Sequence, residues 1–291
     1  MTAAAFVKFL ALGSMLLLVF ALGLRSTAGD AEYLFHRPRL LARSLIAMYV
    51  LTPLVVISVL LQLHLRLPVK IALAALSLSP VPPVLPGKQM KLAARQGYIY
   101  GLLVAASLIA VVWLPLVTSI LTAHFALRAH VSAAAILKII SLTVLLPLAA
   151  GIGVRRYRPE RVAEWSRLLN TVGTALLLVA FIPVLAAEWR AMPSLVGNGT
   201  LLAIIAFTAV GLLIGHILGG PDPQNRTVLA LATASRHPGV AMAIASVSFP
   251  EQRLVAPTLL LALIVGIIAA APYIAWRRRV HAAAPSEDAG L

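Results

Sequence analysis

The chain has 291 residues, of which 61% are hydrophobic and only 11% are charged, and its formal net charge is +15. A soluble domain carries about 25% charged residues, so this composition excludes an ordinary soluble protein and predicts a polytopic membrane protein. The absence of cysteine excludes disulfides, thiolate nucleophiles and thiolate metal sites. We attribute the positive charge to loops that face anionic lipid and expect no nucleic-acid partner.

A membrane span needs about 20 mainly apolar residues, and about nine stretches of the chain meet this requirement. The first is interpreted as a retained span because no convincing cleavage site of small residues follows it. Residues 1–280 are predicted to form one integral membrane domain, followed by a disordered tail at 281–291. The predicted spans are 5–23, 44–63, 68–97, 98–121, 131–153, 168–187, 199–218, 226–248 and 254–276.

Lysine and arginine are distributed unevenly between the loops on the two sides of the predicted membrane domain. With the N-terminus outside, the cytoplasmic side holds 16 of the 24 basic residues, the outside holds 5, and 3 lie within spans. Cytoplasmic loops carry an excess of Lys and Arg. The sequence therefore predicts a multi-pass protein of the inner (plasma) membrane with its N-terminus outside and its C-terminus in the cytoplasm.

The eighth predicted span is interrupted by Ser235, Arg236, His237, Pro238 and Gly239. An arginine in mid-membrane costs at least about 2.5 kcal/mol on insertion scales and usually faces the interior of the bundle or a cavity. Proline removes a backbone donor and glycine loosens the chain, so the helix is predicted to break here. Such a break survives at membrane depth only inside protein or beside a wet cavity.

The third predicted span contains a second break that matches the first. Each break has a Pro-Gly pair with a cation within two residues, Lys88 in one and Arg236 in the other. The two spans run in opposite directions, which indicates inverted repeats with a binding site near the midplane. A new half-helix is predicted just after each pair, and its N-terminus carries partial positive charge. The residues that break the two helices are Pro80, Pro82, Pro83, Pro86, Gly87, Pro238 and Gly239.

The crossing of these two breaks is the candidate substrate and ion site, and no metal or cofactor site is predicted. None of the nine acidic residues falls in mid-membrane, so either backbone carbonyls or a bound anion must neutralise Arg236. Two roles stay open for this arginine, the binding of an anion and the tying of helix-end carbonyls. A histidine here either couples protons near neutrality or is structural, and Lys88 is either a ligand or a cytoplasmic-end residue. The candidate site residues are Arg236, His237, Ser235, Lys88, Gln89 and Ser79, with Ser77 as a further polar side chain.

Four features in this order and spacing resemble the bile acid:sodium symporter family over roughly residues 10–280. They are the His36-Arg-Pro loop, the broken span that ends Lys91-Leu-Ala-Ala-Arg95, the series Lys138, Leu146-Pro147 and Gly151, and Ser235-Arg-His-Pro-Gly-Val-Ala-Met-Ala followed by Phe249-Pro250. The resemblance implies a panel domain and a core domain with two discontinuous core helices that cross at the site. It also implies a ten-span plan without its first span. The core is expected at about 68–125 and 199–277, and the panel at about 5–64 and 131–187.

The chain departs from the pattern of the sodium-coupled members of that family. Those members carry a Glu and a Gln in the second crossing helix, where an alignment on Gly239-Val-Ala places Ala232 and Arg236. The first break offers prolines with Ser77 and Ser79 in place of a Ser/Thr/Asn-rich segment. These departures argue against sodium coupling and favour Arg236 as a built-in substitute for the ion.

The leading hypothesis is a secondary transporter of a small organic anion that works by alternating access. One alternative is a sodium-coupled organic anion symporter with non-standard ion ligands. Another is an integral-membrane, lipid-modifying enzyme, which we do not expect because the chain lacks Cys, a His-Glu-x-x-His motif and an embedded carboxylate beside a His. The last is a non-transporting sensor on a transporter fold.

Overall fold

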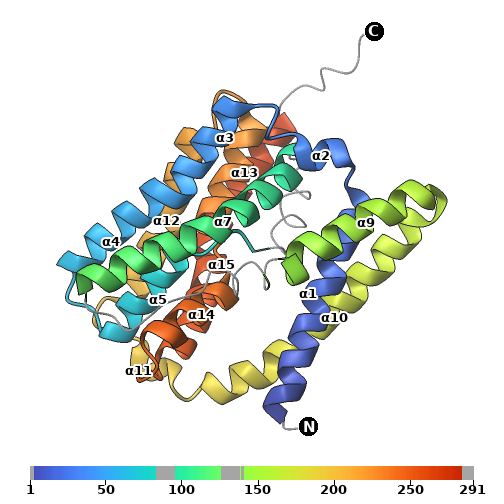
Figure 1. Ribbon diagram of the computed structural model, residues 1–291. Coiled ribbons are helices and arrows are strands. Elements are labelled where there is room, and N and C mark those ends of the chain that lie inside the picture. Colours follow the sequence, from blue (N-terminus) through green and yellow to red (C-terminus); the bar gives the residue numbers. More distant parts are fainter. Residues whose placement is uncertain (1–2, 83–95, 126–137, 139–140, 284–291) are drawn as a thin grey trace.

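Helices make up all the regular structure that the computed structural model describes, which covers residues 3–82, 96–125, 138 and 141–283 (Figure 1). Two of the elements, η1 and η2, are π-helices and η3 is a 3₁₀-helix. The elements are α1 (Ala3–Arg25), α2 (Ala28–Glu32), α3 (Pro38–Leu45), η1 (Ile46–Leu51), α4 (Thr52–Gln62), α5 (Leu67–Leu78), α7 (Gln96–Phe125), η2 (Ser141–Leu145), α9 (Leu146–Tyr157), η3 (Pro159–Arg161), α10 (Val162–Glu188), α11 (Met192–Leu195), α12 (Thr200–Leu218), α13 (Pro223–Ala234), α14 (Pro238–Ser248) and α15 (Val255–Ala283).

Six helical stretches in the described part of the chain are long and apolar enough to cross a membrane. The prediction of an all-helical, multi-pass membrane protein is therefore confirmed. The count of nine spans stays a prediction, because the third and fifth predicted spans fall partly outside the described residues. The six stretches are Pro38–Gln62, Gly97–Val117, Pro159–Glu188, Thr200–Leu218, Pro223–Ser246 and Val255–Val280, with shorter apolar helices at Phe9–Arg25 and Leu67–Leu78.

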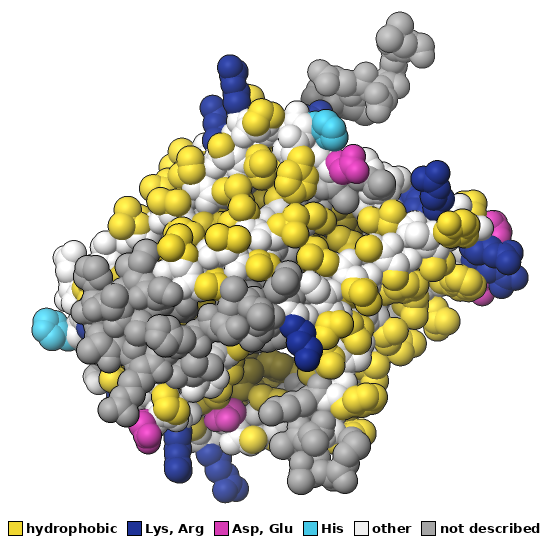
Figure 2. Space-filling view, viewed as in Figure 1, with side chains coloured by type: hydrophobic (Ala, Val, Ile, Leu, Met, Phe, Trp, Pro, Cys, Tyr) yellow, Lys and Arg dark blue, Asp and Glu magenta, His cyan; other side chains and the backbone are white. Residues whose placement is uncertain are grey.

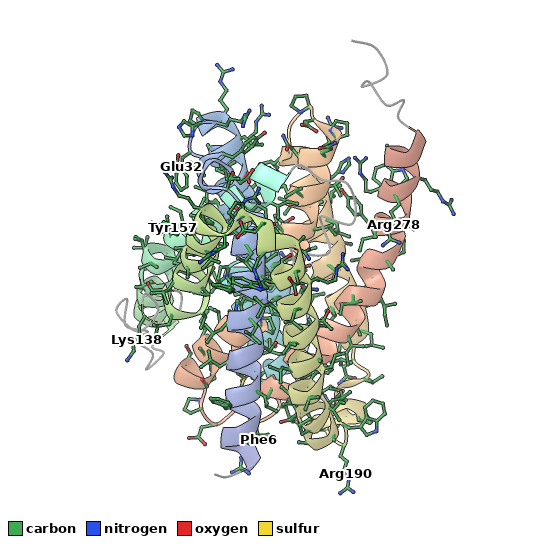
Figure 3. The ribbon with its side chains drawn as sticks, turned by 90° about the vertical axis from the view of Figure 1, so that its right-hand side faces the viewer. Phe6, Glu32, Lys138, Tyr157, Arg190 and Arg278 are labelled. Carbon is green, nitrogen blue, oxygen red and sulfur yellow. The ribbon has the colours of Figure 1, made fainter. Side chains whose placement is uncertain are left out.

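The helices pack as two groups, which Figures 1 and 3 show from two sides. In the smaller group, α1 lies between α9 and α10 and packs on both. The larger group holds α4, α5, α7 and α12 to α15 around one apolar core, and residues 38–62 belong to it through Met48, Val56 and Leu60. This placement differs from the predicted panel range of 5–64, because the apolar face of α4 packs on α5 and α12.

The two groups meet where α7 contacts α1, η2 and α9. Tyr100 and Leu103 of α7 are almost fully buried there, against Val19 and Leu22 of α1 and Leu148 of α9. The short helix α2 also packs on α7 and so joins the end of α1 to the larger group. The described helices thus form a three-helix unit and a larger body. Their assignment to a panel and a core domain stays a prediction.

Close contacts inside each group depend on glycine. A Cβ built on Gly151 of α9 would lie 2.8 Å from the Cα of Gly23 on α1, so the two backbones touch. In the larger group, Gly211 and Gly215 on α12 and Gly219 just after it follow one another at four-residue intervals, and a Cβ on Gly211 would lie 2.8 Å from the Cα of Ala234. Small residues at such spacing let membrane helices approach closely, so α12 and α13 form one tightly packed pair.

Several charged side chains lie at the two ends of the molecule. Figure 3 places Phe6 and Arg190 at one end and Glu32 and Arg278 towards the other. Figure 2 shows hydrophobic side chains over the middle of the visible face, with most of the visible Lys and Arg side chains at its margins. α15 continues to Ala283, past the predicted start of the tail at 281, because the Ala-rich sequence there favours helix.

The contact between Gly23 and Gly151 leads to a test of the packing of α1 on α9. Gly151→Ala is expected to lower the free energy of unfolding by about 1–3 kcal/mol, because the methyl group overpacks the crossing. Gly153 lies on the same helix with nothing within 4 Å of a built Cβ. Gly153→Ala should therefore leave the melting temperature of the purified protein unchanged or raise it. Equal effects of the two substitutions would contradict the described contact.

Candidate functional site

The break between α13 and α14 follows from the local sequence. Asp222 caps the start of α13 by accepting the Gln224 N–H at 2.8 Å. At the other end Pro238 cannot donate to the carbonyl of Ala234 and disfavours helix at the residue before it, so Ser235 and His237 are extended. α14 begins at Pro238 itself, not after the Pro-Gly pair as predicted, because the first helical position needs no N–H.

The structure brings the two predicted breaks together. α5 ends at Leu78, and residues 79–82 that follow it are not helical. The backbone N–H of His237 donates to the carbonyl of Pro80 at 3.0 Å, so the break of one helix is hydrogen-bonded to the break of the other. The end of α5 and the break between α13 and α14 therefore meet at Pro80 and His237, and the predicted continuation of the first span from Pro83 onwards lies outside the described residues.

Arg236 lies at this crossing and is only 4% exposed. Its guanidinium donates three hydrogen bonds: from Nε to the Thr233 carbonyl at 3.0 Å, from Nη1 to the Ser79 carbonyl at 3.1 Å, and from Nη2 to the Met48 carbonyl at 2.8 Å. Thr233 lies in the last turn of α13, and Ser79 follows the last residue of α5. The last carbonyls of a helix lack intrahelical donors and carry partial negative charge, so both suit a cation.

The third acceptor comes from η1, a π-helix inside the predicted second span. Met48 is fully buried in η1. The N–H of Thr52 donates to the Ala47 carbonyl, which is the five-residue spacing of a π-helix. The next residue, Pro53, has no N–H. The Met48 carbonyl thus receives a hydrogen bond neither from Thr52, the donor in an α-helix, nor from Pro53, the donor position in a π-helix. Arg236 donates to it instead.

The predicted polar residues at the breaks are used mainly within their own helices. The Ser79 hydroxyl donates to the Leu76 carbonyl at 2.8 Å, and the Ser77 hydroxyl donates to the Ala74 carbonyl at 2.7 Å. Ser235 is half-buried, and its N–H donates to the Leu231 carbonyl. The described contacts therefore give these serines structural partners.

His237 caps the start of α14. Its Nδ1 accepts the N–H of Val240 at 3.4 Å, which assigns the ring hydrogen to Nε2. A protonated imidazole could not accept this bond. The cap therefore favours a neutral ring and the structural role over proton coupling.

Five of the predicted residues, Pro83, Pro86, Gly87, Lys88 and Gln89, lie outside the described residues. Of the remaining ones, Pro80 and Pro82 belong to the non-helical segment after α5. Sequence reasoning offered helix-end carbonyls as partners of Arg236, a class that includes the Thr233 carbonyl, but it did not identify the Met48 carbonyl. Pro53 signals a freed carbonyl in this stretch, but α-helical spacing assigns it to Tyr49, four residues earlier. Only the π-helical spacing of η1 moves the freed carbonyl to Met48.

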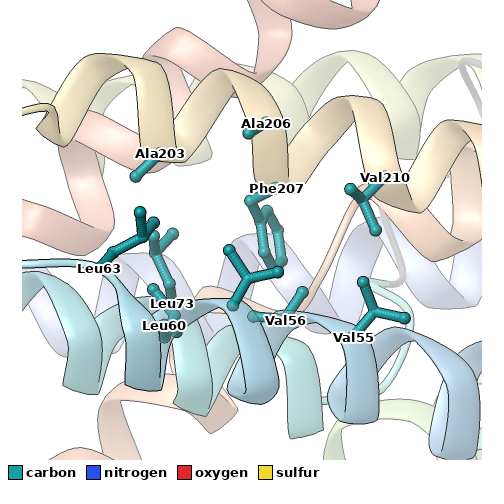
Figure 4. A pocket seen from close by; sticks show the side chains of 10 residues that line it. Val55, Val56, Leu60, Leu63, Leu73, Ala203, Ala206, Phe207 and Val210 are labelled. Carbon is teal, nitrogen blue, oxygen red and sulfur yellow. The ribbon is translucent and has the colours of Figure 1, made fainter.

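A separate hollow lies between α4 and α12, away from the crossing (Figure 4). Its lining is apolar throughout, with Val55 and Val56 on α4 and Phe207 and Val210 on α12. Such a surface offers no donor to an anion. The apolar hollow is therefore not a competing anion site to Arg236.

The arginine has donors left for a ligand. A guanidinium carries five N–H groups, and its three hydrogen bonds to described residues leave two. The carbonyls share the positive charge through their dipoles but do not cancel it. The crossing therefore combines a buried net positive charge with spare donors, which is the chemistry that binds a carboxylate or another oxyanion.

Comparison with known proteins places this geometry in context. A sequence model described as the Sodium Bile acid symporter family matches residues 11–192, a range that includes the first break but ends before Arg236. The chain is also similar to a Bacillus subtilis (strain 168) protein named "Uncharacterized sodium-dependent transporter YocS". The two are 26% identical over 239 residues, which cover 80% of this chain and 72% of the relative.

The contacts of Arg236 predict its contribution to stability. Arg236→Met leaves three buried carbonyls without their donor, each at a cost of about 1–3 kcal/mol. We expect the melting temperature of the purified protein to fall by several degrees. Arg190 is exposed at the end of α10 (Figure 3), so Arg190→Met removes the same charge at little cost. A fall no larger than that of Arg190→Met would show that the three hydrogen bonds do not hold the crossing together.

Proposed function

Because the chain belongs to the Sodium Bile acid symporter family, we propose that it is a secondary transporter of a small organic anion in which Arg236 takes the place of a sodium ion. The observation that carries the proposal is a buried guanidinium that binds three backbone carbonyls at the crossing of two broken helices. Family membership supports a small-molecule transporter in a lipid bilayer. The anion and the role of Arg236 are our inference.

Charge argues for an anionic substrate. The nine acidic residues of the chain all fall outside the crossing in sequence, for example Asp222 at the start of α13 and Glu251 after α14. A cation that is desolvated without a counter-charge is costly, and a bound anion offsets this cost. A carboxylate or a sulfonate of the substrate meets this requirement through the two remaining N–H groups.

The acceptors of Arg236 argue for a substituted ion. In transporters with broken helices, unwound carbonyls and the C-terminal ends of half-helices coordinate sodium. The Thr233 and Ser79 carbonyls are of this kind, and Arg236 already occupies them. A sodium ion on the same oxygens would lie next to the guanidinium charge and be repelled by it, so we propose that transport does not depend on sodium.

A sodium-coupled symporter with other ion ligands is the second candidate. It is favoured by the printed name of the B. subtilis relative, which describes that protein as sodium-dependent. This mode needs ligands that Arg236 does not occupy. The two candidates differ in one measurable respect, the effect of sodium on anion binding.

The division into two helical groups supports alternating access. α1, α9 and α10 pack on one another, while α12, α13 and α15 pack within the larger group that carries Arg236. A movement of one group against the other exposes the crossing to each side in turn, as in transporters built from inverted repeats. This mechanism requires no chemical step, so the proposed protein is not an enzyme.

Anion binding is tested by thermal unfolding of the purified protein with a panel of organic carboxylates and sulfonates. A ligand present at 100 times its Kd stabilises the native state by about 2.7 kcal/mol. We expect stabilisation by at least one anion, unchanged when potassium replaces sodium, and lost in Arg236→Gln. Uptake of that anion into proteoliposomes then separates a transporter from a sensor. Stabilisation that needs sodium would refute the substitution of the ion by Arg236.

The orientation is tested with single cysteines, since the natural chain has none. We propose that Arg190 lies outside and Arg278 lies in the cytoplasm, at opposite ends of the molecule in Figure 3. In intact cells a membrane-impermeant maleimide should label Arg190→Cys and spare Arg278→Cys. Labelling of Arg278→Cys alone would reverse the proposed orientation.

A further inference from the structure

Pro53 is the residue that makes the third carbonyl available to Arg236. We propose that it is a positioning residue for the cation site, because its missing N–H leaves the Met48 carbonyl to the guanidinium. The contribution to anion binding rests on the function proposed above. The hydrogen-bond argument itself depends only on the contacts of η1 and Arg236.

The hydrogen bonds of η1 determine which carbonyl is left over. In an α-helix the Met48 carbonyl would accept from Thr52, but that N–H donates to Ala47. In a π-helix it would accept from Pro53, which has no N–H. Arg236 Nη2 lies 2.8 Å from this carbonyl oxygen and supplies the donor. A residue 188 positions away in the sequence thus completes the hydrogen bonding of the helix.

Two side chains fix η1 around this carbonyl. The Thr52 hydroxyl donates to the Ala47 carbonyl at 2.7 Å, which holds the wide turn closed on one side. The Tyr49 hydroxyl donates to the Ala106 carbonyl at 2.5 Å, which ties η1 to α7. Met48 and Tyr49 are buried, so water does not reach the free carbonyl from the surface. The contacts of Thr52 and Tyr49 thus hold η1 in place on both sides of this carbonyl.

Pro53 could alternatively serve only to kink its helix, which is the usual role of a proline within a span. A kink alone needs no particular partner for the carbonyl that it frees. Here the freed carbonyl completes a set of three acceptors, and the other two come from the ends of broken helices at Ser79 and Thr233. The two breaks and Pro53 therefore each free one carbonyl, from three separate elements, and all three carbonyls accept hydrogen bonds from Arg236.

The chain offers a matched control in its second π-helix. Pro147 follows η2 (Ser141–Leu145) as the second residue of α9, just as Pro53 follows η1 as the second residue of α4. α9 packs on α1 in the smaller helical group, and none of the three hydrogen bonds of Arg236 goes to it. Pro147→Ala thus repairs a similar helix without touching the cation site.

The experiment is a double-mutant cycle in thermal unfolding, measured without anion and without sodium. Pro53→Ala and Pro147→Ala are each made with Arg236 and with Arg236→Met. Once the guanidinium is gone, the restored N–H gives the orphaned Met48 carbonyl its only donor. The change in melting temperature caused by Pro53→Ala should then be more positive in the Arg236→Met background than with Arg236, by about 3 °C or more. Pro147→Ala should shift the melting temperature equally in both backgrounds.

Equal shifts for Pro53→Ala in the two backgrounds would overturn the proposal and leave the proposed function untouched. If Arg236→Met does not give folded protein, Arg236→Lys serves as the second background. Its single ammonium cannot serve three acceptors in fork geometry, so the same inequality is expected. The cycle needs no substrate, so its outcome is independent of transport.

Anion titration adds a second measurement, the Kd of the anion, which Pro53→Ala would leave unchanged if the proline had only a structural role. With Met48 served by the backbone, Nη2 loses an acceptor and its N–H turns to the anion. Pro53→Ala should lower the Kd of the anion about threefold or more, with no change in Pro147→Ala. An unchanged Kd would refute the positioning role in binding. Absence of any anion binding in the wild type, together with a non-additive cycle, would refute the proposed function and leave the positioning role standing.

Discussion

One constraint governs the rest of the structure: the buried guanidinium of Arg236 needs oxygen acceptors, and the described residues around it offer no carboxylate. Inside a bilayer, regular helices use all their carbonyls for their own hydrogen bonds. Only interrupted helices have carbonyls to give, and Arg236 takes one from each of three interruptions: the end of α13, the end of α5 and the π-helix η1. The irregular backbone at membrane depth and the buried cation thus stabilise each other.

The same constraint explains the packing around α13. Thr233 gives its carbonyl to Arg236, and its hydroxyl donates to the Gly211 carbonyl on α12 at 2.5 Å. This approach is close because α12 presents glycines at Gly211 and Gly215. The half-helix that ends at the cation is therefore anchored sideways, and its terminal carbonyls hold their direction although the helix stops in mid-membrane. α1 and α9 make a comparable close contact in the other group, so each unit has its own point of rigid packing.

Sequence reasoning identified the break at Ser235 to Gly239 and the lack of a carboxylate for Arg236, because charge and proline are local signals. It predicted a first break for the same reason, and the described part of that stretch, residues 79–82, is non-helical and hydrogen-bonded to the second break between Pro80 and His237. It did not identify Met48, because Pro53 frees the Tyr49 carbonyl in an α-helix, and the sequence did not reveal the π-helical spacing of η1 that frees Met48 instead. The grouping of residues 38–62 with α5 and α12 was also missed. An apolar face shows that a helix packs, but not on which neighbour.

A positive charge that belongs to the chain cannot be exchanged with the solution, and this has a consequence for the energetics of transport. A dissolved sodium ion carries the free energy of its gradient into a transport cycle, whereas in the proposed cycle Arg236 stays part of the protein and contributes no such gradient. For a monovalent anion the membrane potential alone then contributes about 2.3 kcal/mol per 100 mV. With the cytoplasm negative, this term drives the anion outwards. Net accumulation would require exchange against a second anion or a substrate concentration that is higher outside.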